Sequence, residues 1–221
     1  MTFRATLGMI LLTATTNASG EVELPSPTFD GTTSVEKAIY ERRSVRRFAS
    51  APLSLAQVSQ LLWSAQGTTS PLGYRTAPSA GALYPLETYL VAGNVTGLEP
   101  GVYRYTSGEN SLEQIIKGDH RKPLMRAASN QSFAGRAPAS IILTAVFTRV
   151  TNSYGRRGTR YVNMEAGHAA QNVYLQAVSL ELGTVVVGAF SDDRVRKLLQ
   201  IPVTETPLYI MPIGKPASRG R

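Results

Sequence analysis

Apolar residues recur at the spacing of an α-helix in five stretches of the chain. The first stretch begins with Thr33 and Glu36 in the pattern of a capping box, and the second repeats this pattern with Ser54 and Gln57. The longest stretch is rich in alanine and ends at Gly183, a residue that favours the end of a helix. The predicted helices span 33–43, 54–67, 119–128, 160–183 and 192–201.

Strands are predicted where short runs of β-branched and aromatic residues lie between turns that contain glycine. The first three runs follow one another closely and are predicted to pair as antiparallel neighbours. The run ASIILTAVF is apolar throughout, which indicates a central strand covered on both faces. The predicted strands span 87–93, 102–105, 111–116, 139–147, 184–190 and 207–214. Together the elements predict an α+β domain with a central, mostly antiparallel sheet of about five strands and helices on both faces.

The N-terminal residues predict an export signal followed by an arm. Residues 1–20 combine one arginine, an apolar stretch and a run of small residues, which is typical of a secretory signal peptide; a misplaced start or a frayed tail is the alternative. We therefore expect an exported or periplasmic protein rather than a cytoplasmic one. Residues 21–33 are predicted to form an extended arm, and 34–221 a single domain. No apolar run is long enough to predict a stable membrane span.

Composition narrows the chemistry. The chain has no cysteine and two histidines, which excludes disulfides, thiolate catalysis and multi-histidine metal sites, so we expect no metal site. Lysine and arginine outnumber aspartate and glutamate by 23 to 15, and this excess favours an anionic partner such as a phosphate-bearing cofactor, nucleic acid or a membrane surface. The sequence contains no nucleic-acid-reading module, so nucleic acid is not the partner we expect.

The segment ERRSVRRF, at 41–48, is the densest positive charge in the chain. Arg42, Arg43 and Arg46, with the Ser44 hydroxyl, are suited to a phosphate because guanidinium groups donate charge-assisted hydrogen bonds to its oxygens. The alternative is a solvated helix end, where the helix dipole favours basic residues. Neither of the glycine-rich nucleotide loops, GxGxxG or GxxxxGK[ST], occurs in the sequence.

Two further stretches are rich in small residues. TAPSAGALYPLE, at 76–87, allows backbone N–H groups to approach a flat ligand closely, and GTVVVGAF ends with Gly188 and Ala189, where a bulky side chain would block a ring. Taken singly, each stretch is an ordinary turn more often than a site. Arg149, Arg156, Arg157 and Arg160 form a second basic cluster, which we interpret as a solvated loop, with attraction of an anionic substrate as the alternative.

Four motifs in this order carry a resemblance to a known family. RRSVRRF, APSAGALYPLE, RYVNMEAGHAAQNVYLQAVSLELGTVVVGAF and PLYIMPIGKP, between Leu24 and Pro216, resemble the flavin-dependent nitroreductase superfamily, and specifically its SagB-type dehydrogenase branch. The resemblance implies a nitroreductase-like fold, an interlocked homodimer, and FMN bound at the subunit interface.

The resemblance also implies roles for particular residues. The arginine-rich segment would hold the FMN phosphate and ribityl chain, and the small-residue loop of the other subunit would contact the flavin ring. Asn130 or Gln131 would lie near the pyrimidine edge, and Gly188 and Ala189 near N5. The implied cofactor-binding residues are Arg42, Arg43, Ser44, Arg46, Pro78, Ser79, Ala80, Gly81, Asn130, Gln131, Gly188, Ala189 and Arg219.

The implied activity is an FMN-dependent oxidoreductase that works by a ping-pong mechanism on an unidentified small molecule, with NAD(P)H as a candidate donor. SagB-type enzymes that oxidise azolines are thought to use a Lys–Tyr pair; here Ser153 stands in the lysine position and Tyr154 in the tyrosine position, which argues against azole formation. Tyr154 is the candidate catalytic acid or base, with a packing role as its alternative. A non-catalytic flavin-binding or flavin-sequestering protein is the second hypothesis. An anion-binding module without flavin is the third.

Overall fold

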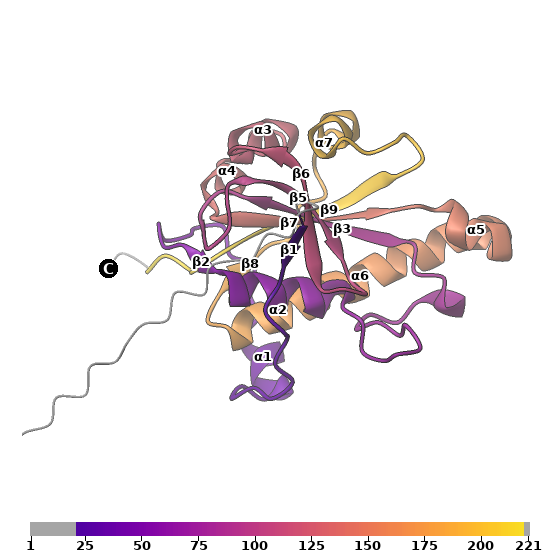
Figure 1. Cartoon of the computed structure of the whole chain (residues 1–221), viewed down its shortest axis with the longest axis horizontal. Helices are drawn as coiled ribbons and strands as arrows, with labels where there is room; N and C mark the ends of the chain where they lie inside the picture. Colours follow the sequence, from indigo (N-terminus) through magenta and orange to yellow (C-terminus); the bar gives the residue numbers. More distant parts are fainter. Residues whose placement is uncertain (1–20, 219–221) are drawn as a thin grey trace, which may run out of the picture.

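A seven-stranded sheet forms the centre of the protein in the computed structural model, which describes residues 21–218 (Figure 1). The strand order is β1-β6-β5-β3-β7-β9-β8, and every pairing in this sheet is antiparallel. The strands are β1 (Glu21–Glu23), β3 (Leu86–Ala92), β5 (Gly101–Thr106), β6 (Ser111–Lys117), β7 (Ala139–Ala145), β8 (Gly183–Thr184) and β9 (Thr206–Gly214), with a small parallel pair, β2 (Leu53–Ser54) and β4 (Val95–Thr96). The predicted α+β class and antiparallel sheet are confirmed, while the short strands β1, β2 and β4 were not predicted.

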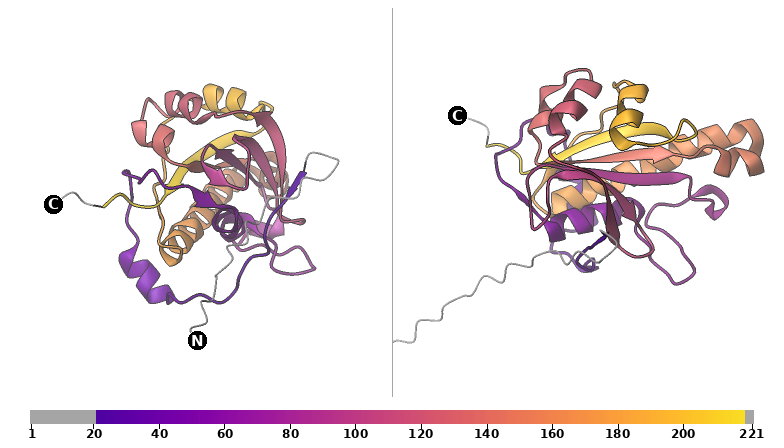
Figure 2. Two further views of the ribbon diagram at one scale, coloured as in Figure 1. Left: turned by 60° about the vertical axis from the view of Figure 1, so that its left-hand side comes forward. Right: turned by 45° about the horizontal axis from the view of Figure 1, so that its top comes forward.

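Helices cover both faces of this sheet (Figures 1 and 2). Helices α2 and α6 lie on one face, with α1 beneath them, and α3, α4 and α7 lie on the other. The helices are α1 (Val35–Glu41), α2 (Leu55–Gln66), α3 (Arg121–Ala127), α4 (Ser132–Arg136), α5 (Thr148–Tyr154), α6 (Gly158–Ser179) and α7 (Asp192–Leu199), with 3-10 turns η1 (Ala80–Ala82) and η2 (Gly155–Arg157).

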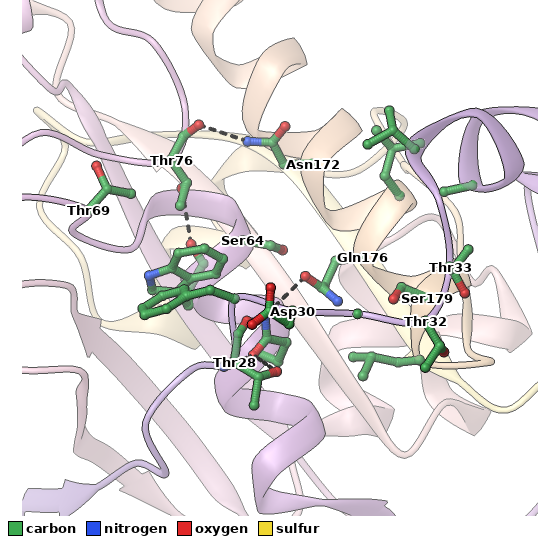
Figure 3. A pocket seen from close by; sticks show the side chains of 18 residues that line it. Thr28, Asp30, Thr32, Thr33, Ser64, Thr69, Thr76, Asn172, Gln176 and Ser179 are labelled. Atoms are coloured by element: carbon green, nitrogen blue, oxygen red, sulfur yellow. Dashed lines mark hydrogen bonds between the residues drawn. The ribbon is translucent and has the colours of Figure 1, made fainter.

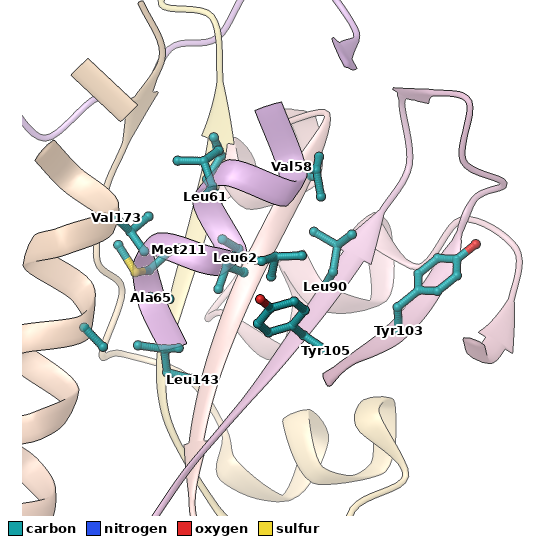
Figure 4. Close-up of a cluster of buried hydrophobic side chains, with 14 of the residues drawn as sticks. Val58, Leu61, Leu62, Ala65, Leu90, Tyr103, Tyr105, Leu143, Val173 and Met211 are labelled. Carbon is teal, nitrogen blue, oxygen red and sulfur yellow. The ribbon is translucent and has the colours of Figure 1, made fainter. Parts of the chain in front are cut away.

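The central strand β7 shows why two helical layers are needed. All seven of its residues are buried, and their side chains alternate between the two faces. Ile141 and Leu143 pack in the core shared with α2 and α6, which Figure 4 shows, whereas Ile142 packs in the core shared with α3, α4 and α7. A strand that is apolar on both faces must be covered on both, so the prediction for this run is confirmed.

The start of α1 differs from the prediction. Ser34, and not Thr33, caps the helix: its backbone is extended and its hydroxyl accepts from the Lys37 N–H at 3.2 Å. The helix ends at Glu41 instead of continuing to residue 43. Of its seven residues only Ala38 is buried, so its apolar residues Val35 and Ile39 are solvent-exposed in the single chain. The second capping box, Ser54 with Gln57, is confirmed.

The end of α6 also differs from the prediction. The helix stops at Ser179, and the chain turns through Glu181, which has a φ of 56°. The turn is closed by the Leu182 N–H, which donates to the Ala177 carbonyl at 2.7 Å. Gly183 therefore begins β8 and does not end the helix. The strand predicted at 184–190 is reduced to Thr184 in β8 and a bridge at Val187, because the intervening residues turn between the two cores.

The arm begins as part of the sheet. Its residues 21–23 form β1, which pairs with β6, and the Thr28 N–H then donates to Gln60 of α2 at 2.9 Å. The predicted export signal, 1–20, and Arg219 lie outside the described residues. Within residues 21–218 no helix combines the length and the apolar character that crossing a membrane requires.

Candidate functional site

The arginine-rich segment 42–48 pairs with two other parts of the chain. The Val45 N–H donates to the Thr184 carbonyl at 2.9 Å, at the start of β8. The segment that follows β9 pairs with it as well, since the Ala217 N–H donates to the Arg47 carbonyl at 2.9 Å. Backbone bonds thus fix the path of the segment without using its side chains.

The three predicted arginines have different surroundings. The Arg42 guanidinium lies 5.1 Å from the centre of the Tyr174 ring, in cation–π geometry. Arg43 donates to the carbonyls of Tyr40 and Arg42 at 2.8 Å each, so it caps the end of α1. Arg46 is exposed. Within residues 21–218 no carboxylate lies within 4.0 Å of any of these three guanidinium groups, so their charge is available to a ligand.

Two residues beside this segment were missed by the sequence analysis. The Tyr174 hydroxyl of α6 accepts from the Val186 N–H at 2.9 Å and lies 3.2 Å from the Ser44 hydroxyl, within hydrogen-bond distance. Thr184 is buried, and its hydroxyl has no partner among the described residues. The sequence offered only helical spacing for Tyr174 and an apolar run for Thr184, and both patterns predict packing. A cavity of about 420 Å³ opens here, lined by Arg43, Val45, Tyr174 and Thr184 among others.

The structure brings two of the predicted ring-binding stretches together. Gln131 and Ser129, in the loop before α4, donate to the carbonyl of Ala189 at 3.2 and 3.4 Å. Asn130 is exposed beside them, with a φ of 59°. Gly188 is also exposed, and a Cβ added to it would meet no atom within 4 Å. A flat surface of backbone is therefore open to solvent at Gly188 and Ala189.

The small-residue loop that carries Pro78, Ser79, Ala80 and Gly81 is tightly folded. The Ser79 hydroxyl accepts from the Tyr84 N–H at 2.9 Å and closes the turn. Gly81 and Ala82 have positive φ values, 63° and 52°, which are uncommon for residues with a Cβ. Pro78 and Gly81 are exposed, so this turn presents small groups at the surface.

Tyr154, the candidate catalytic residue, lies against this loop. A Cβ added to Gly81 would lie 2.8 Å from the Tyr154 hydroxyl, which shows how closely the two approach. The Tyr154 ring packs edge-to-face on Tyr161, with 5.2 Å between ring centres, and is 41% exposed. The Tyr154 hydroxyl thus lies at the surface of the loop, and Tyr161 supports the ring.

Glu165 of α6 lies beneath the same loop and is buried. Burial raises the pKa of Glu165 to about 7, although a hydrogen bond with Ser79 and the charge of Arg75 act in the opposite direction. One carboxyl oxygen, Oε1, has no partner among the described residues. The structure gives Glu165 a role in supporting the loop.

Two of the groups of predicted residues, the 42–46 segment and the 78–81 loop, lie apart within one chain. Ser79 contacts α6 at Glu165, and Ser44 contacts it at Tyr174, nine residues further along. At 1.5 Å per residue the two contacts are roughly 13 Å apart along the helix axis. Figures 1 and 2 agree with this separation, because the η1 turn and α5 lie at one end of the sheet and the segment after α1 lies at the other, near the C-terminus.

A cavity of about 750 Å³ lies elsewhere, between the arm, α2 and α6 (Figure 3). Its walls are tied by Asn172, which donates to the Thr76 carbonyl at 3.2 Å, and by Gln60, which donates to Gln176 at 3.1 Å. Among the described residues that line it, Asp30 is the one ionisable side chain, and none of the predicted site residues contributes. Despite its volume, this cavity lacks the charge that an anionic cofactor requires.

Metal ligands are not gathered anywhere in the described part of the chain: no group of three or more histidine, aspartate or glutamate side chains in residues 21–218 is placed to hold an ion. The donors that the structure does gather are guanidinium, hydroxyl and backbone N–H groups.

Comparison with known proteins places this arrangement in a family. The sequence model of the nitroreductase family matches residues 39–215. The chain is 47% identical over 181 residues to the candidate nitroreductase MJ1384 of Methanocaldococcus jannaschii, which covers 82% of this chain and 90% of that protein. It is 28% identical over 170 residues to McbC, a microcin B17-processing protein of Escherichia coli, covering 73% of this chain and 62% of McbC.

The fold agrees with these sequence matches. A crystal structure of a candidate nitroreductase from Ralstonia eutropha superimposes with a TM-score of 0.78 at 27% identity, covering 99% of this chain and all of the other. The family match over most of the chain, the identity to MJ1384 and the shared fold show that this protein belongs to the nitroreductase family.

Proposed function

We propose that this protein is an FMN-dependent oxidoreductase of the SagB type, active as a homodimer on a small molecule. The observation that carries the proposal is the set of donors around Tyr174. Arg42 and Arg46 have no carboxylate partner within residues 21–218, and the Thr184 hydroxyl is buried without a partner. A phosphate group would satisfy donors that the protein alone leaves unpaired, together with the Ser44 hydroxyl.

The open backbone at Gly188 and Ala189 suits the flavin ring. A side chain at position 188 would occupy free space, so glycine keeps that space for a ligand. Gln131 is held to the Ala189 carbonyl and carries a side-chain amide able to pair with a pyrimidine edge. These residues fit a flat, hydrogen-bonding ring better than they fit a packed turn.

The separation of the two groups along α6 supports a dimer. We infer that the loop of Pro78 to Gly81 contacting the same ligand as the 42–46 segment comes from a second subunit, because within one chain the two lie at opposite ends of the sheet. The solvent-exposed Val35 and Ile39 of α1 offer apolar surface for such an association.

When bound, FMN supplies the two-electron redox chemistry of the reaction. The chain's own residues would bind the phosphate, fix the ring and leave one of its faces accessible, so that donor and acceptor react in turn by a ping-pong mechanism. Tyr154, at the loop surface, would hold a proton for the reaction. Ser153 cannot replace a lysine base, so azoline oxidation is not the activity we propose, although McbC is named for peptide processing.

The absorbance spectrum of the protein after incubation with FMN and desalting tests this function. We expect stoichiometric flavin bands that bleach with NADH or NADPH under anaerobic conditions and return with an acceptor. Bands that bleach only with dithionite would favour the non-catalytic flavin-binding reading, and no retained flavin would contradict the cofactor.

The Arg42→Ala/Arg46→Ala variant should bind FMN about 100-fold more weakly, because two charge-assisted contacts are lost. Fluorescence titration of FMN measures this change. Lys122→Ala/Arg126→Ala removes the same charge from the exposed surface of α3 and should bind FMN as the parent does. Equal weakening in both variants would indicate a general charge effect.

Mixing two defective variants tests the shared site. Pro78→Glu places a charge on the exposed loop, and Arg42→Ala/Arg46→Ala disables the other half. Each variant alone should retain little flavin. If every site takes one half from each subunit, random reassortment after mixing restores about a quarter of the sites, since one site in each mixed dimer is intact. No restoration despite proven subunit exchange would contradict the shared site.

A further inference from the structure

Strands β3 and β5 separate at one end of the sheet. Their pairing runs from Ala92 opposite Gly101 to Tyr89 opposite Arg104, yet β3 begins three residues earlier, at Leu86, and β5 continues to Thr106. On its other side β3 stays paired with β7 over its whole length. A cavity of about 420 Å³ lies where the two strands part, and the residues that line it include Gln66, Arg75, Glu87, Thr88, Arg104 and Arg149.

Three arginines from different elements converge on this cavity with a single acid. Glu87 of β3 pairs with Arg104 of β5 at 3.0 Å and with Arg149 of α5 at 2.5 Å. Arg75 lies before the small-residue loop and has no carboxylate within 4.0 Å among the described residues. Three positive charges and one negative charge leave a local excess of two positive charges. This excess favours an anion over a cation or a neutral ligand.

Arg75 is held in place by neutral partners. Its guanidinium donates to the Gln66 side-chain oxygen at 2.8 Å and stacks on the Tyr84 ring at 4.8 Å. Burial lowers the pKa of Arg75 from its usual range, while the nearby Glu87 and Glu165 oppose this change. A guanidinium that is partly removed from water and lacks a carboxylate gains from an anion placed beside it.

Two buried donors in the cavity wall have no partner. Gln66 is 1% exposed, and its Nε2 amide has no hydrogen bond among the described residues, although its oxygen is fixed by Arg75. Thr88 is 2% exposed, and its hydroxyl likewise has none. An unpaired buried donor costs free energy, so each such group in a native protein calls for a ligand or a water molecule.

We propose that this cavity is a second binding site, for a small oxyanion such as the phosphate or carboxylate group of a small molecule. Arg75, Arg104 and Arg149 supply the charge, and Gln66 and Thr88 supply further hydrogen bonds. None of the proposed flavin-binding residues in the described part of the chain lines the cavity, so the site is separate from the flavin site and does not depend on the proposed function.

Thermal unfolding of the FMN-incubated protein tests the proposal, with phosphate, sulfate or malonate replacing chloride at constant ionic strength. A saturable rise in Tm is expected, and the anion that gives the lower half-saturation concentration distinguishes a phosphate-type ligand from a carboxylate. Arg104→Gln, which changes a half-exposed side chain, should raise the half-saturation concentration about ten-fold. Arg196→Gln, which breaks another salt bridge, should leave it unchanged.

A second variant, Thr88→Val, tests the cavity without changing its charge. Thr88→Val removes only the unpaired hydroxyl, so the anion-free protein should unfold at a higher temperature while anion binding weakens by several-fold. An equal response of the parent and Arg104→Gln, or no saturable response in the parent, would overturn the proposal. Loss of the response in Arg42→Ala/Arg46→Ala but not in Arg104→Gln would assign the anion to the flavin phosphate position and overturn it as well.

Discussion

Glu165 in the first half of α6 and Tyr174 in its second half mark the two halves of the proposed site, and these halves are built differently. At Glu165 the neighbouring loop is shaped by its own side chains and by strained backbone, with positive φ at Gly81 and Ala82. At Tyr174 the neighbouring segment 42–48 is shaped by backbone hydrogen bonds to Thr184 and to the C-terminal segment. The side chains of Arg42 and Ser44 contact Tyr174, and that of Arg46 is exposed.

The loop at Glu165 therefore contributes a fixed shape to the proposed site, and the segment at Tyr174 contributes positive charge. The loop at Glu165 presents a fixed surface of small groups, which suits contact with a rigid ring. In the segment at Tyr174, Arg43 bonds backbone carbonyls at the end of α1. The other arginines of the segment are not needed for the fold in this way, so they remain available to an anion. Substitutions at the first end should therefore act through strain and buried charge, and substitutions at the second end through packing beneath the backbone ladder.

Gly183→Ala should give the largest effect, because it acts on that packing. A Cβ at position 183 would lie 2.6 Å from Cγ2 of Val45, in the middle of the ladder that positions the arginines. We expect a loss of about 3 kcal/mol in the free energy of unfolding, measured by chemical denaturation, with weaker FMN binding. Combined with Val45→Ala the loss should be smaller than the sum of the single losses. Strict additivity would show that the two residues do not meet.

Glu165→Gln tests the buried charge beneath the loop, because the stability difference between this variant and the parent should depend on pH. Because the pKa of Glu165 is raised to about 7 in the folded protein, the folded form holds a proton that the unfolded chain releases above about pH 4.5. The parent should thus lose stability as the pH rises from about 4.5 to 7. The amide has no charge to bury, so the variant should be more stable than the parent by about 3 kcal/mol at pH 8 and similar to it at pH 4.

Equilibrium unfolding of both proteins across this pH range measures the difference. Asp192→Asn, at an exposed carboxyl in the first turn of α7, is the control. It keeps Glu165, so its stability should follow the same pH dependence as that of the parent. A parent whose stability rises between pH 5 and 7 relative to Glu165→Gln would contradict the assignment.

The same contrast explains what the sequence could predict. The buried strand β7, the capped helix α2 and the antiparallel strands follow from local patterns of period 2 or 3.6, and these were predicted correctly. The predicted end of α6 was wrong because Gly183 was interpreted as a helix-ending glycine from its neighbours in the sequence. In the structure Gly183 packs against Val45, which lies 138 residues earlier in the chain. The short strand β1 has no pattern of its own, and β8 overlaps the strand predicted at 184–190 only at Thr184.

The candidate site shows the same limit. The arginines and the small-residue loop are visible as composition, but Tyr174, Thr184 and Glu165 gain their meaning only from partners far away in the sequence. The splayed end of β3 and β5 is equally invisible, because both segments are ordinary strands by pattern and differ only in where their pairing stops.

Gly81→Ala tests the strained end of the comparison. The residue has a φ of 63°, and its Cβ would approach the Tyr154 hydroxyl at 2.8 Å, so we expect a loss of about 1 to 2 kcal/mol in unfolding free energy. Tyr154→Phe should recover only the part that is due to the clash. Gly73→Ala, at another positive φ but with no atom within 4 Å, isolates the cost of the backbone alone. Equal losses of unfolding free energy in Gly81→Ala and Gly73→Ala would show that contact with Tyr154 contributes nothing to the cost.

Tyr174→Phe should have the smallest effect on stability and the most specific one. The variant keeps the ring beneath Arg42 but removes the hydroxyl that accepts from the Val186 N–H and lies beside Ser44. One lost hydrogen bond in a partly buried place costs about 1 kcal/mol. If the hydroxyl also orients Ser44 toward the ligand, FMN should bind several-fold more weakly, as titration will measure, while the stability of the loop at Glu165 is unchanged. A change in stability without a change in FMN affinity would make Tyr174 a structural residue, and would leave the anion to the arginines alone.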